Sequence, residues 1–261
     1  MLSFLKGKIK LISLPNFCGK LYMRFIPALF IFVLLGCRTN TRTAAAPATD
    51  RVYSYKTPHP DGIGKVFYGR EIAHVMSAAG GSWLERPERE LEEKVSEAIA
   101  AMSLHDSSVV ADIGAGSGYY AFRIAPRIPE GTLYAVEVQD AFVQQLKRTA
   151  KAKGFNNVVV VKGSATAPNL PPASIDLAFM VDVYHELKHP HEMLQALHQA
   201  LKPTGRILLI EYRGEDPAVP IKALHKMTVA QADKEMAQAG FVLDQKKEVL
   251  PIQHWLLYKK K

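Results

Sequence analysis

Short apolar runs alternate with amphipathic stretches along the chain from about residue 66 onward. The apolar runs have the length of buried strands, and the stretches between them place apolar residues every three or four positions, as helices do. The runs lie at residues 109–113, 132–138, 157–161, 175–181 and 206–212. The amphipathic stretches lie at residues 119–128, 141–152, 191–201 and 228–239. This alternation predicts a parallel sheet with helices on both faces.

A further helix is expected before the first strand. Residues 86–90 read RPERE, with a proline near the first turn and acidic residues beside the positive end of the helix dipole. Leu91, Val95, Ile99 and Met102 then follow at helical spacing. They predict one apolar stripe that packs against the sheet.

Two parts of the pattern differ from the rest. Residues 157–161 are mostly valine without polar alternation, which predicts a strand buried on both faces. The last two strands, 241–249 and 252–258, are separated only by Leu250 and Pro251. Because no helix fits between them, they must form an antiparallel hairpin. A parallel sheet that ends in such a hairpin departs from a dinucleotide-binding fold.

Composition and charge restrict the classes of protein. The 261 residues, 48% of them hydrophobic, suit one medium domain with extra segments or two small domains. Of the net charge of +8, +6 lies in residues 1–50, so the rest is nearly neutral and no nucleic-acid partner is expected. The two cysteines, Cys18 and Cys37, precede the predicted sheet and form neither a disulfide framework nor a CxxC metal motif.

The front of the chain has the pattern of a targeting segment. Residues 23–37 read MRFIPALFIFVLLGC, a charged start followed by a short apolar run. The run gives about 18 Å of helix, which is too short for a bilayer core of about 30 Å. The ending LLGC resembles the bacterial lipobox, in which the cysteine is lipidated and becomes the mature N-terminus. The competing interpretation is a buried core helix or an isolated apolar run.

The domain organisation follows from this segment. Residues 1–37 are expected to be a leader and lipoprotein-type signal peptide, with Met23 as the expected start of translation and Cys37 as the lipidation site. Residues 38–65, rich in Thr, Ala and Pro, are expected to be a flexible tether, and residues 66–261 the folded domain. The predicted location is the periplasmic face of the bacterial cell envelope, or the cytoplasm if the signal is not used.

A glycine loop follows the first strand of the predicted sheet. Residues 111–120 read ADIGAGSGYY and place Gly114, Gly116 and Gly118 where a ligand meets the carboxyl ends of the strands. Tyr119 stands where a dinucleotide fingerprint has its last glycine, so a nicotinamide-dependent oxidoreductase is disfavoured. The loop also lacks the Lys and Thr of a triphosphate loop. Glu137, at the end of the second strand, is suited to accept hydrogen bonds from both hydroxyls of a ribose.

The sequence resembles the class I S-adenosylmethionine-dependent methyltransferases over roughly residues 86–258. The resemblance rests on VVADIGAGSGYY, AVEVQD, LPPASIDLAFMVDVYHEL, LKPTGRILLIEY and the closing hairpin. It implies a Rossmann-like α/β fold with a mostly parallel seven-stranded sheet. The segments REIAHVM, WLERPERE, DVYHE and IKALHKMT resemble a little-characterised bacterial subgroup of small-molecule-type methyltransferases.

The resemblance implies a role for each matching position. The residues that would surround the methionine part of S-adenosylmethionine are Asp112, Gly114, Ala115, Gly116 and Gly118. Glu137 would bind the ribose, Ser164 and Ala165 would border the adenine, and Asp182 would line the pocket near the methyl group. Ser164 departs from the aspartate that the family often has there, so the adenine amino group would meet a neutral acceptor.

The candidate catalytic groups lie after the fourth strand in DVYHELKHPHE. Asp182, Tyr184 and His185 are candidates, with His185 able to deprotonate an acceptor. The alternative is that these residues fix the loop or cover the cofactor. HELKH also spells HExxH, but Pro190 disfavours the helix that a zinc site needs, so no metal is expected.

The acceptor is expected to be a small molecule or a lipid-like compound. Glu186, Trp83 and His225 are candidate wall residues of its pocket, although each would serve equally in packing. The Asn-Pro-Pro-Tyr motif of enzymes that methylate bases is absent. A non-catalytic binding lipoprotein stays open as an alternative, because an exported anchor conflicts with a cofactor made in the cytoplasm.

Overall fold

The computed structural model describes residues 52–261. The predicted leader and signal peptide, with Met23 and Cys37, lie outside the described residues, as does the first part of the predicted tether, residues 38–51. Within the described part of the chain, every helix is too short or too polar to cross a membrane.

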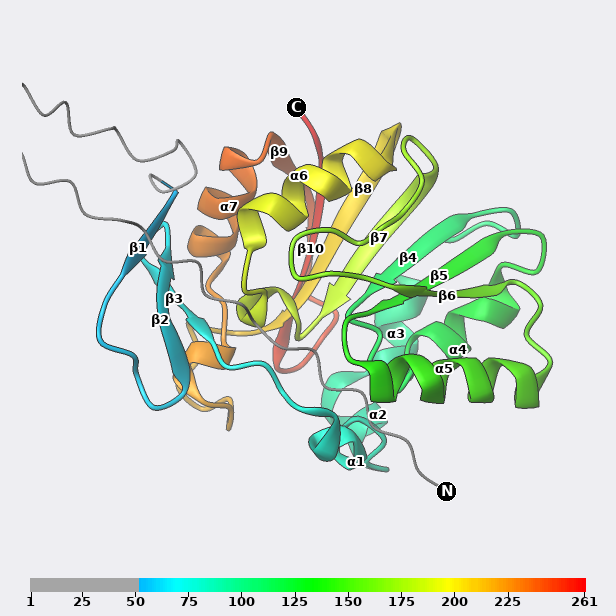
Figure 1. Cartoon of the computed structure of the whole chain (residues 1–261), viewed down its shortest axis with the longest axis horizontal. Helices are drawn as coiled ribbons and strands as arrows, with labels where there is room; N and C mark the ends of the chain where they lie inside the picture. Colours follow the sequence, from blue (N-terminus) through cyan, green and yellow to red (C-terminus); the bar gives the residue numbers. More distant parts are fainter. Residues whose placement is uncertain (1–51) are drawn as a thin grey trace, which may run out of the picture. The chain divides into compact units, whose positions relative to one another are not determined.

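A seven-stranded sheet with the order β6-β5-β4-β7-β8-β10-β9 forms the centre of the fold (Figure 1). The strands are β4 (Val109–Ile113), β5 (Thr132–Glu137), β6 (Val158–Lys162), β7 (Ile175–Val181), β8 (Leu201–Tyr212), β9 (Phe241–Lys247) and β10 (Gln253–Lys260). Strands β4 to β8 pair in parallel, whereas β10 is antiparallel to both β8 and β9. The predicted fold, a mostly parallel sheet closed by an antiparallel hairpin, is confirmed.

Helices cover both faces of the sheet, as the alternating pattern predicted. One face carries α3 (Val95–Ala100), α4 (Ala121–Ile124) with the 3-10 turn η3 (Ala125–Arg127), and α5 (Asp140–Lys153); the other carries α6 (Pro190–Ala200) and α7 (Val229–Gln238) (Figure 1). Successive residues of a strand point to opposite faces, so neighbours such as Phe179 and Met180 on β7 enter different core clusters.

The predicted helix before β4 is interrupted. The structure has α1 (Gly81–Leu84), α2 (Arg89–Glu93) and α3, and Lys94 between α2 and α3 adopts a left-handed conformation with φ of 49°. This conformation interrupts the helix between α2 and α3, so the predicted apolar residues do not form a stripe along one face of a single helix. Leu91 is 83% exposed, whereas Ile99 is 2% exposed. The prediction is therefore wrong for Leu91.

The valine strand is an edge strand and is not buried on both faces as predicted. Strand β6 stands last in the sheet, and among the described strands it pairs only with β5. Val159 is consequently 43% exposed. The β-branched residues stabilise the strand conformation here without being fully buried.

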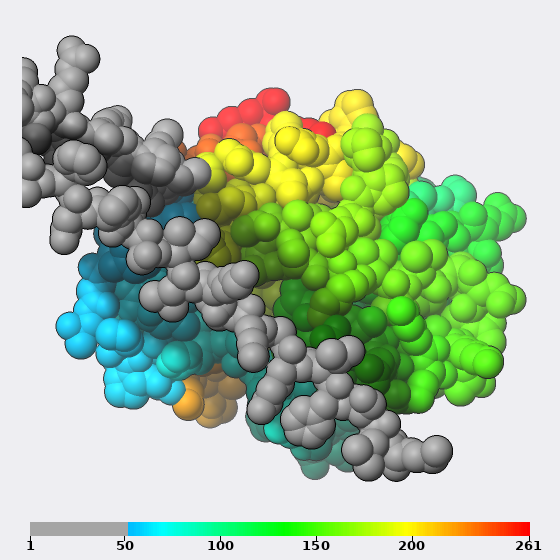
Figure 2. Space-filling model, viewed as in Figure 1, coloured from blue at the N-terminus to red at the C-terminus, as the bar shows by residue number. Residues whose placement is uncertain are grey.

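The structure also differs from the predicted tether over its last residues. Strands β1 (Tyr53–Tyr55), β2 (Gly62–Phe67) and β3 (Arg70–Ala73) form a three-stranded antiparallel sheet. This sheet, blue and cyan in Figures 1 and 2, lies at one end of the described domain, beside α7. The guanidinium of Arg70 binds Glu235 of α7 at 2.8 Å and the carbonyl of His185 at 2.9 Å. Arg70 lies in β3, just after the predicted tether, and β3 pairs with β2, so the last residues of the predicted tether are held in this sheet.

Candidate functional site

A cavity of about 820 Å³ lies at the carboxyl ends of β4, β5, β7 and β8. Its volume is within the range of small-molecule pockets, roughly 300–1,000 Å³. Twelve of the predicted site residues line it, namely Trp83, Asp112, Gly114, Ala115, Gly116, Glu137, Ser164, Ala165, Asp182, His185, Glu186 and His225. Gly118 and Tyr184 are the two predicted residues in residues 52–261 that do not line it.

The glycine loop curls over the end of β5 on its way to α4. The backbone N–H groups of Gly114 and Ala115 both donate to the carbonyl of Val136, at 2.9 and 3.0 Å. Gly114 has φ of 77°, and a Cβ there would lie 2.7 Å from Val183. Gly118, with φ of 87°, faces α4 and α5, where a Cβ would overlap the Phe122 ring. Gly114 therefore lets the backbone form the cavity floor, and Gly118 lets the loop enter α4.

Glu137 ties this loop to the end of β5. Its Oε2 accepts the N–H of Gly116 at 2.9 Å, and its Oε1 accepts the N–H groups of Val138 at 2.6 Å and Gln139 at 2.8 Å. A carboxylate has about four acceptor sites. Binding both hydroxyls of a ribose therefore requires at least one of these amide bonds to be exchanged.

Two further carboxyl groups lie deep in the cavity wall. Burial and the charge of Glu137 raise the pKa of Asp112 to about 8. Burial, with the charges of Glu93 and Glu211, raises the pKa of Asp182 well above its ordinary value. Because burial penalises an unpaired negative charge, these groups favour a cationic partner in the cavity.

Asp182 is also held in an unusual backbone conformation. It follows β7 with φ of 53°, a region that costs most residues about 1–2 kcal/mol. Its Oδ2 accepts the side-chain N–H of Gln253 at 2.8 Å. Its Oδ1 is buried and has no hydrogen-bond partner among residues 52–261. A strained, incompletely satisfied polar group is typical of a ligand site.

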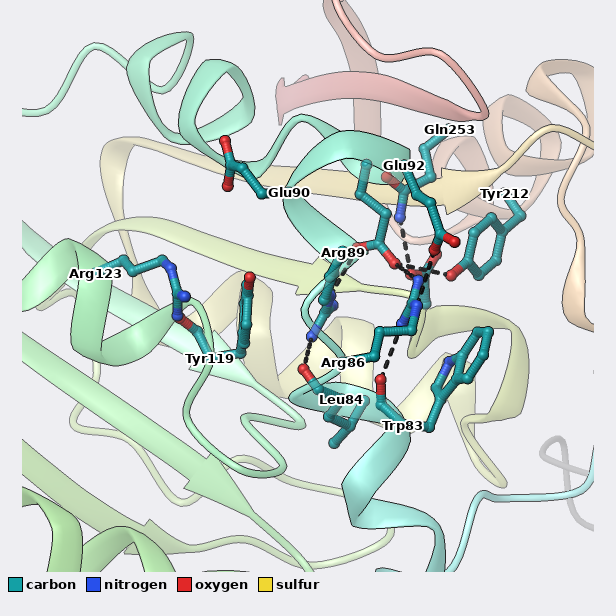
Figure 3. A network of polar contacts seen from close by, with 12 residues as sticks. Trp83, Leu84, Arg86, Arg89, Glu90, Glu92, Tyr119, Arg123, Tyr212 and Gln253 are labelled. Atoms are coloured by element: carbon teal, nitrogen blue, oxygen red, sulfur yellow. Dashed lines mark hydrogen bonds and ion pairs between the residues drawn. The ribbon is translucent and has the colours of Figure 1, made fainter.

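A buried charge network holds the segment before β4 against the cavity (Figure 3). Glu93 accepts hydrogen bonds from Arg86 at 2.6 Å, Arg89 at 2.8 Å and the hydroxyl of Tyr212 at 3.1 Å. The guanidinium of Arg86 also stacks on the ring of Trp83, 3.8 Å from its centroid. Sequence reasoning missed this network; the Arg89–Glu93 spacing of four residues was the available indication.

Tyr119 contacts two arginines, Arg89 of this network and Arg123 of α4. Its ring lies 4.5 Å from the Arg89 guanidinium carbon and 3.5 Å from that of Arg123 (Figure 3). Tyr119 lines the cavity. The large residue at the last position of the loop thus supports the cavity wall through cation–π contacts.

His185 is oriented by a buried glutamate. The 3-10 turn η4 (Tyr184–Glu186) places His185 Nδ1 at 2.6 Å from Oε2 of Glu211, near the end of β8. The other oxygen of Glu211 accepts the N–H groups of Val183 at 3.2 Å and Tyr184 at 2.7 Å. The sequence placed Glu211 in the segment EYRGEDPAVPIKALHKMT, beside the predicted fifth strand, but did not show that it pairs with His185.

A second histidine contacts the free edge of His185. His225, in the 3-10 turn η5 (Ala223–His225), places Nδ1 at 3.1 Å from His185 Nε2. Burial alone would lower the pKa of His185, but the charge and hydrogen bond of Glu211 outweigh it and raise the pKa. Burial and His185 lower the pKa of His225 to about 4, and burial raises the pKa of Glu186 to about 7.

Tyr184 points away from these groups. It is fully buried in the core formed with α6 and α7, and the Arg70 guanidinium lies 5.5 Å from its ring centroid. A 3-10 turn rotates successive side chains by about 120°, so Tyr184 faces the core while His185 and Glu186 face the cavity. The structure therefore gives Tyr184 a packing role, and only Asp182 and His185 of the predicted catalytic residues line the cavity.

Ser164 and Ala165 border the cavity after β6. The hydroxyl of Ser164 accepts the N–H of Ala167 at 3.0 Å and donates to its carbonyl at 3.2 Å. The side chain thus stabilises its own turn, as serine often does.

Comparisons with known proteins agree with this geometry. Residues 111–207 match the family model described as "Methyltransferase domain". The chain is 26% identical over 116 residues to a demethylmenaquinone methyltransferase of Chlamydia muridarum. The aligned residues make up 44% of this chain and 49% of that protein. It is 33% identical over 79 residues to a protein-L-isoaspartate O-methyltransferase of Ignicoccus hospitalis, 30% of this chain and 37% of that protein. The chain therefore spans about half the length, or less, of these relatives.

Solved structures show the same fold. A crystal structure of a SAM-dependent methyltransferase from Aquifex aeolicus superposes with a TM-score of 0.66 at 22% identity, over 70% of this chain and 98% of that one. The mostly parallel seven-stranded sheet with helices around it is consistent with this fold. The chain therefore has the Rossmann-like fold of class I methyltransferases, and the methyltransferase domain that residues 111–207 match has S-adenosylmethionine as its cofactor.

Proposed function

We propose that this protein transfers a methyl group from S-adenosylmethionine to a small-molecule or lipid-like acceptor. The observation that carries the proposal is the shared cavity. The glycine loop, Glu137 and His185 all line it, and His185 is oriented by Glu211. A cofactor site and a proton-accepting group thus open into the same space.

The residues around the glycine loop and Glu137 fit the cofactor. S-adenosylmethionine supplies a methyl group activated by the positive charge of the neighbouring sulfur. The buried carboxyl groups of Asp112 and Asp182 favour its ammonium and sulfonium charges. Glu137 accepts hydrogen bonds from the ribose, the backbone at Gly114 and Gly116 approaches the methionine part, and the turn at 164–165 borders the adenine.

The other residues that line the cavity fit an acceptor with an apolar body. Apolar side chains there include those of Val75, Met76, Trp83, Leu187, Pro220 and Ile221. The hydrogen bond to Glu211 keeps the proton of His185 on Nδ1, so that Nε2 can take the proton that a hydroxyl acceptor loses. Alignment of the acceptor with the methyl group also raises the rate.

Calorimetric titration of the full chain with S-adenosylmethionine tests the cofactor assignment. We expect saturable binding of one cofactor per chain, and weaker binding by the Glu137→Ala variant because the ribose loses its acceptor. His254→Gln is the control, since His254 pairs with Glu215 at 2.7 Å and does not line the cavity. Absence of saturable binding at millimolar cofactor would contradict the proposal.

A second test separates binding from proton transfer. The His185→Gln variant should still bind the cofactor but release S-adenosylhomocysteine about 10²–10⁴-fold more slowly, the usual contribution of a general base. The probe acceptor is a total lipid extract from bacterial envelopes, supplemented with demethylmenaquinone, the compound in the name of the relative from Chlamydia muridarum. Equal rates for wild type and variant would remove His185 from the reaction.

We further propose that Cys37 carries the lipid that places this activity at the periplasmic face of the cell envelope. The support is the sequence MRFIPALFIFVLLGC, with Met23 as its start. An anchor at the membrane would also present the cavity to lipid-like acceptors. This location requires S-adenosylmethionine to reach the envelope.

A further inference from the structure

His185, Glu186 and His225 bring two imidazoles and a carboxylate together at one wall of the cavity. One ligating atom from each residue lies within 4.8 Å of those from the other two. We propose that these three side chains form a binding site for a divalent transition-metal ion such as Zn²⁺ or Co²⁺. The combination of two histidines and one carboxylate is a common ligand set for such ions.

The separation of the two imidazoles fits a shared ion. Nitrogen ligands lie about 2.0–2.1 Å from zinc, so that two of them in tetrahedral positions are about 3.3 Å apart. His185 Nε2 and His225 Nδ1 are 3.1 Å apart. Glu186 and His225 are only partly buried, so rotation of their side chains can complete the coordination. The Glu186 carboxylate accepts a backbone hydrogen bond from Met76 at 3.0 Å, which holds it beside the cavity.

Glu211 completes the arrangement that metal-binding histidines usually have. Such histidines donate their second ring N–H to a carboxylate or carbonyl, which fixes the tautomer and the ring orientation. His185 Nδ1 makes this contact with Glu211 at 2.6 Å, so its Nε2 presents a lone pair to His225. Glu211 is itself held by two backbone N–H groups of the β7–η4 connection.

The second histidine of the proposed site is therefore not the second histidine of the HExxH pattern. His189 does not line the cavity; its Nδ1 lies 3.0 Å from Lys65 Nζ. His225 comes instead from 40 residues beyond His185. A metal site therefore forms here despite Pro190, because the second histidine is supplied by η5 and not by the next helical turn.

Three protein ligands leave open coordination positions that face the cavity. The acceptor that such a site takes carries an oxygen donor, a hydroxyl or a carboxylate, attached to an apolar body. In the metal-loaded protein His185 Nε2 is a ligand, so His185 would position the acceptor through the ion instead of taking its proton. The site depends on the three side chains alone and does not require methyl transfer.

The test uses the full chain with Cys18→Ser and Cys37→Ser, so that thiols do not bind metal. After dialysis against a chelator, Co²⁺ is titrated and followed by visible absorption, and Zn²⁺ by calorimetry. We expect saturable binding of one ion per chain, lost in His225→Ala and in Glu186→Gln. His74→Ala is the matched control and should bind as the parent does, because His74 lines the cavity outside the cluster. Glu211→Gln should weaken binding by about 10–100-fold.

Thermal unfolding checks that each variant is folded, and calorimetry with S-adenosylmethionine is run separately. Absence of saturable Co²⁺ and Zn²⁺ binding by the parent, or equal binding by the parent and His225→Ala, overturns the proposal and leaves a hydrogen-bonded histidine pair. Metal binding without cofactor binding would contradict the proposed function alone. Cofactor binding without metal binding would contradict the metal site alone.

Discussion

Buried acidic side chains dominate the chemistry of the cavity at the scale of single residues. Burial is the largest cause of the raised pKa values of Asp112, Asp182 and Glu186. An acid with a raised pKa stabilises the folded protein below its unfolded pKa, and this stability is lost as the pH rises through the folded pKa. The site therefore lowers the stability of the ligand-free protein in alkaline solution, and a cationic ligand would offset the loss.

Replacement of Asp112 by Asn should make this loss visible. The pKa of Asp112 is raised from 3.8 to about 8, so in the wild type its contribution to stability falls between about pH 4 and pH 8. The slope is at most about 1.4 kcal/mol per pH unit. Without cofactor, Asp112→Asn should lose less stability than the wild type between pH 6 and pH 9, as measured by urea unfolding. Asp106→Asn, at an exposed position, is the control, and parallel curves for Asp112→Asn and wild type would contradict the assignment.

The residues of the site could be predicted from the sequence only where they belong to a local motif. Gly114, Gly116 and Glu137 lie in the loop and at the strand end where spacing placed them. Glu93 and Glu211 were not found as functional partners, because each acts through side chains that are distant in sequence. An acidic residue in an apolar run indicates a buried partner but does not identify it.

At the scale of elements, strands were more predictable than the helix before β4. Strands β4 and β7 begin and end at the predicted residues, since a buried strand is a continuous apolar run. The helical stripe failed at Lys94, whose left-handed conformation no side-chain pattern expresses. The buried charge network around Glu93 explains why the helix is interrupted at Lys94. It holds α2 against the cavity while α3 packs on the sheet.

Two substitutions test this interruption. Leu91→Ala should change the free energy of unfolding by no more than about 0.5 kcal/mol, since the side chain is 83% exposed. Ile99→Ala should cost about 2–5 kcal/mol, because Ile99 is 2% exposed in the core. Denaturant unfolding of both variants gives the comparison. A cost above about 2 kcal/mol for Leu91→Ala would instead support one continuous helix with a buried stripe.

At the scale of the whole molecule, the cavity is assembled from segments far apart in sequence. The loop after β3, the glycine loop, the end of β7 and the segment around η5 all contribute to its wall. The three-stranded sheet supports this assembly, because Arg70 joins α7 to the carbonyl of His185. The N-terminal segment of the described domain is thus part of the architecture that positions the site.

The predicted lipid anchor also belongs to this scale. Cells that express the full chain should incorporate a fatty-acid probe into the protein, and Cys37→Ser should abolish the labelling because the lipobox cysteine is the residue that carries the lipid. The measurement is in-gel detection of the probe, with Cys18→Ser as the matched control. Equal labelling of Cys37→Ser and wild type would remove the anchor and favour a cytoplasmic protein.

Local sequence was enough to predict the alternation of strands and helices, the closing hairpin, the glycine loop and the position of Glu137. These features depend on hydrophobic periodicity, backbone freedom and spacing along one stretch of chain, all of which are local. The edge position of β6, the packing of Tyr184 and the contacts of His185 with Glu211 and His225 became apparent only in the folded chain. Those outcomes depend on which distant segments become neighbours, because the burial of a side chain and the charges around it are set only when the chain has folded.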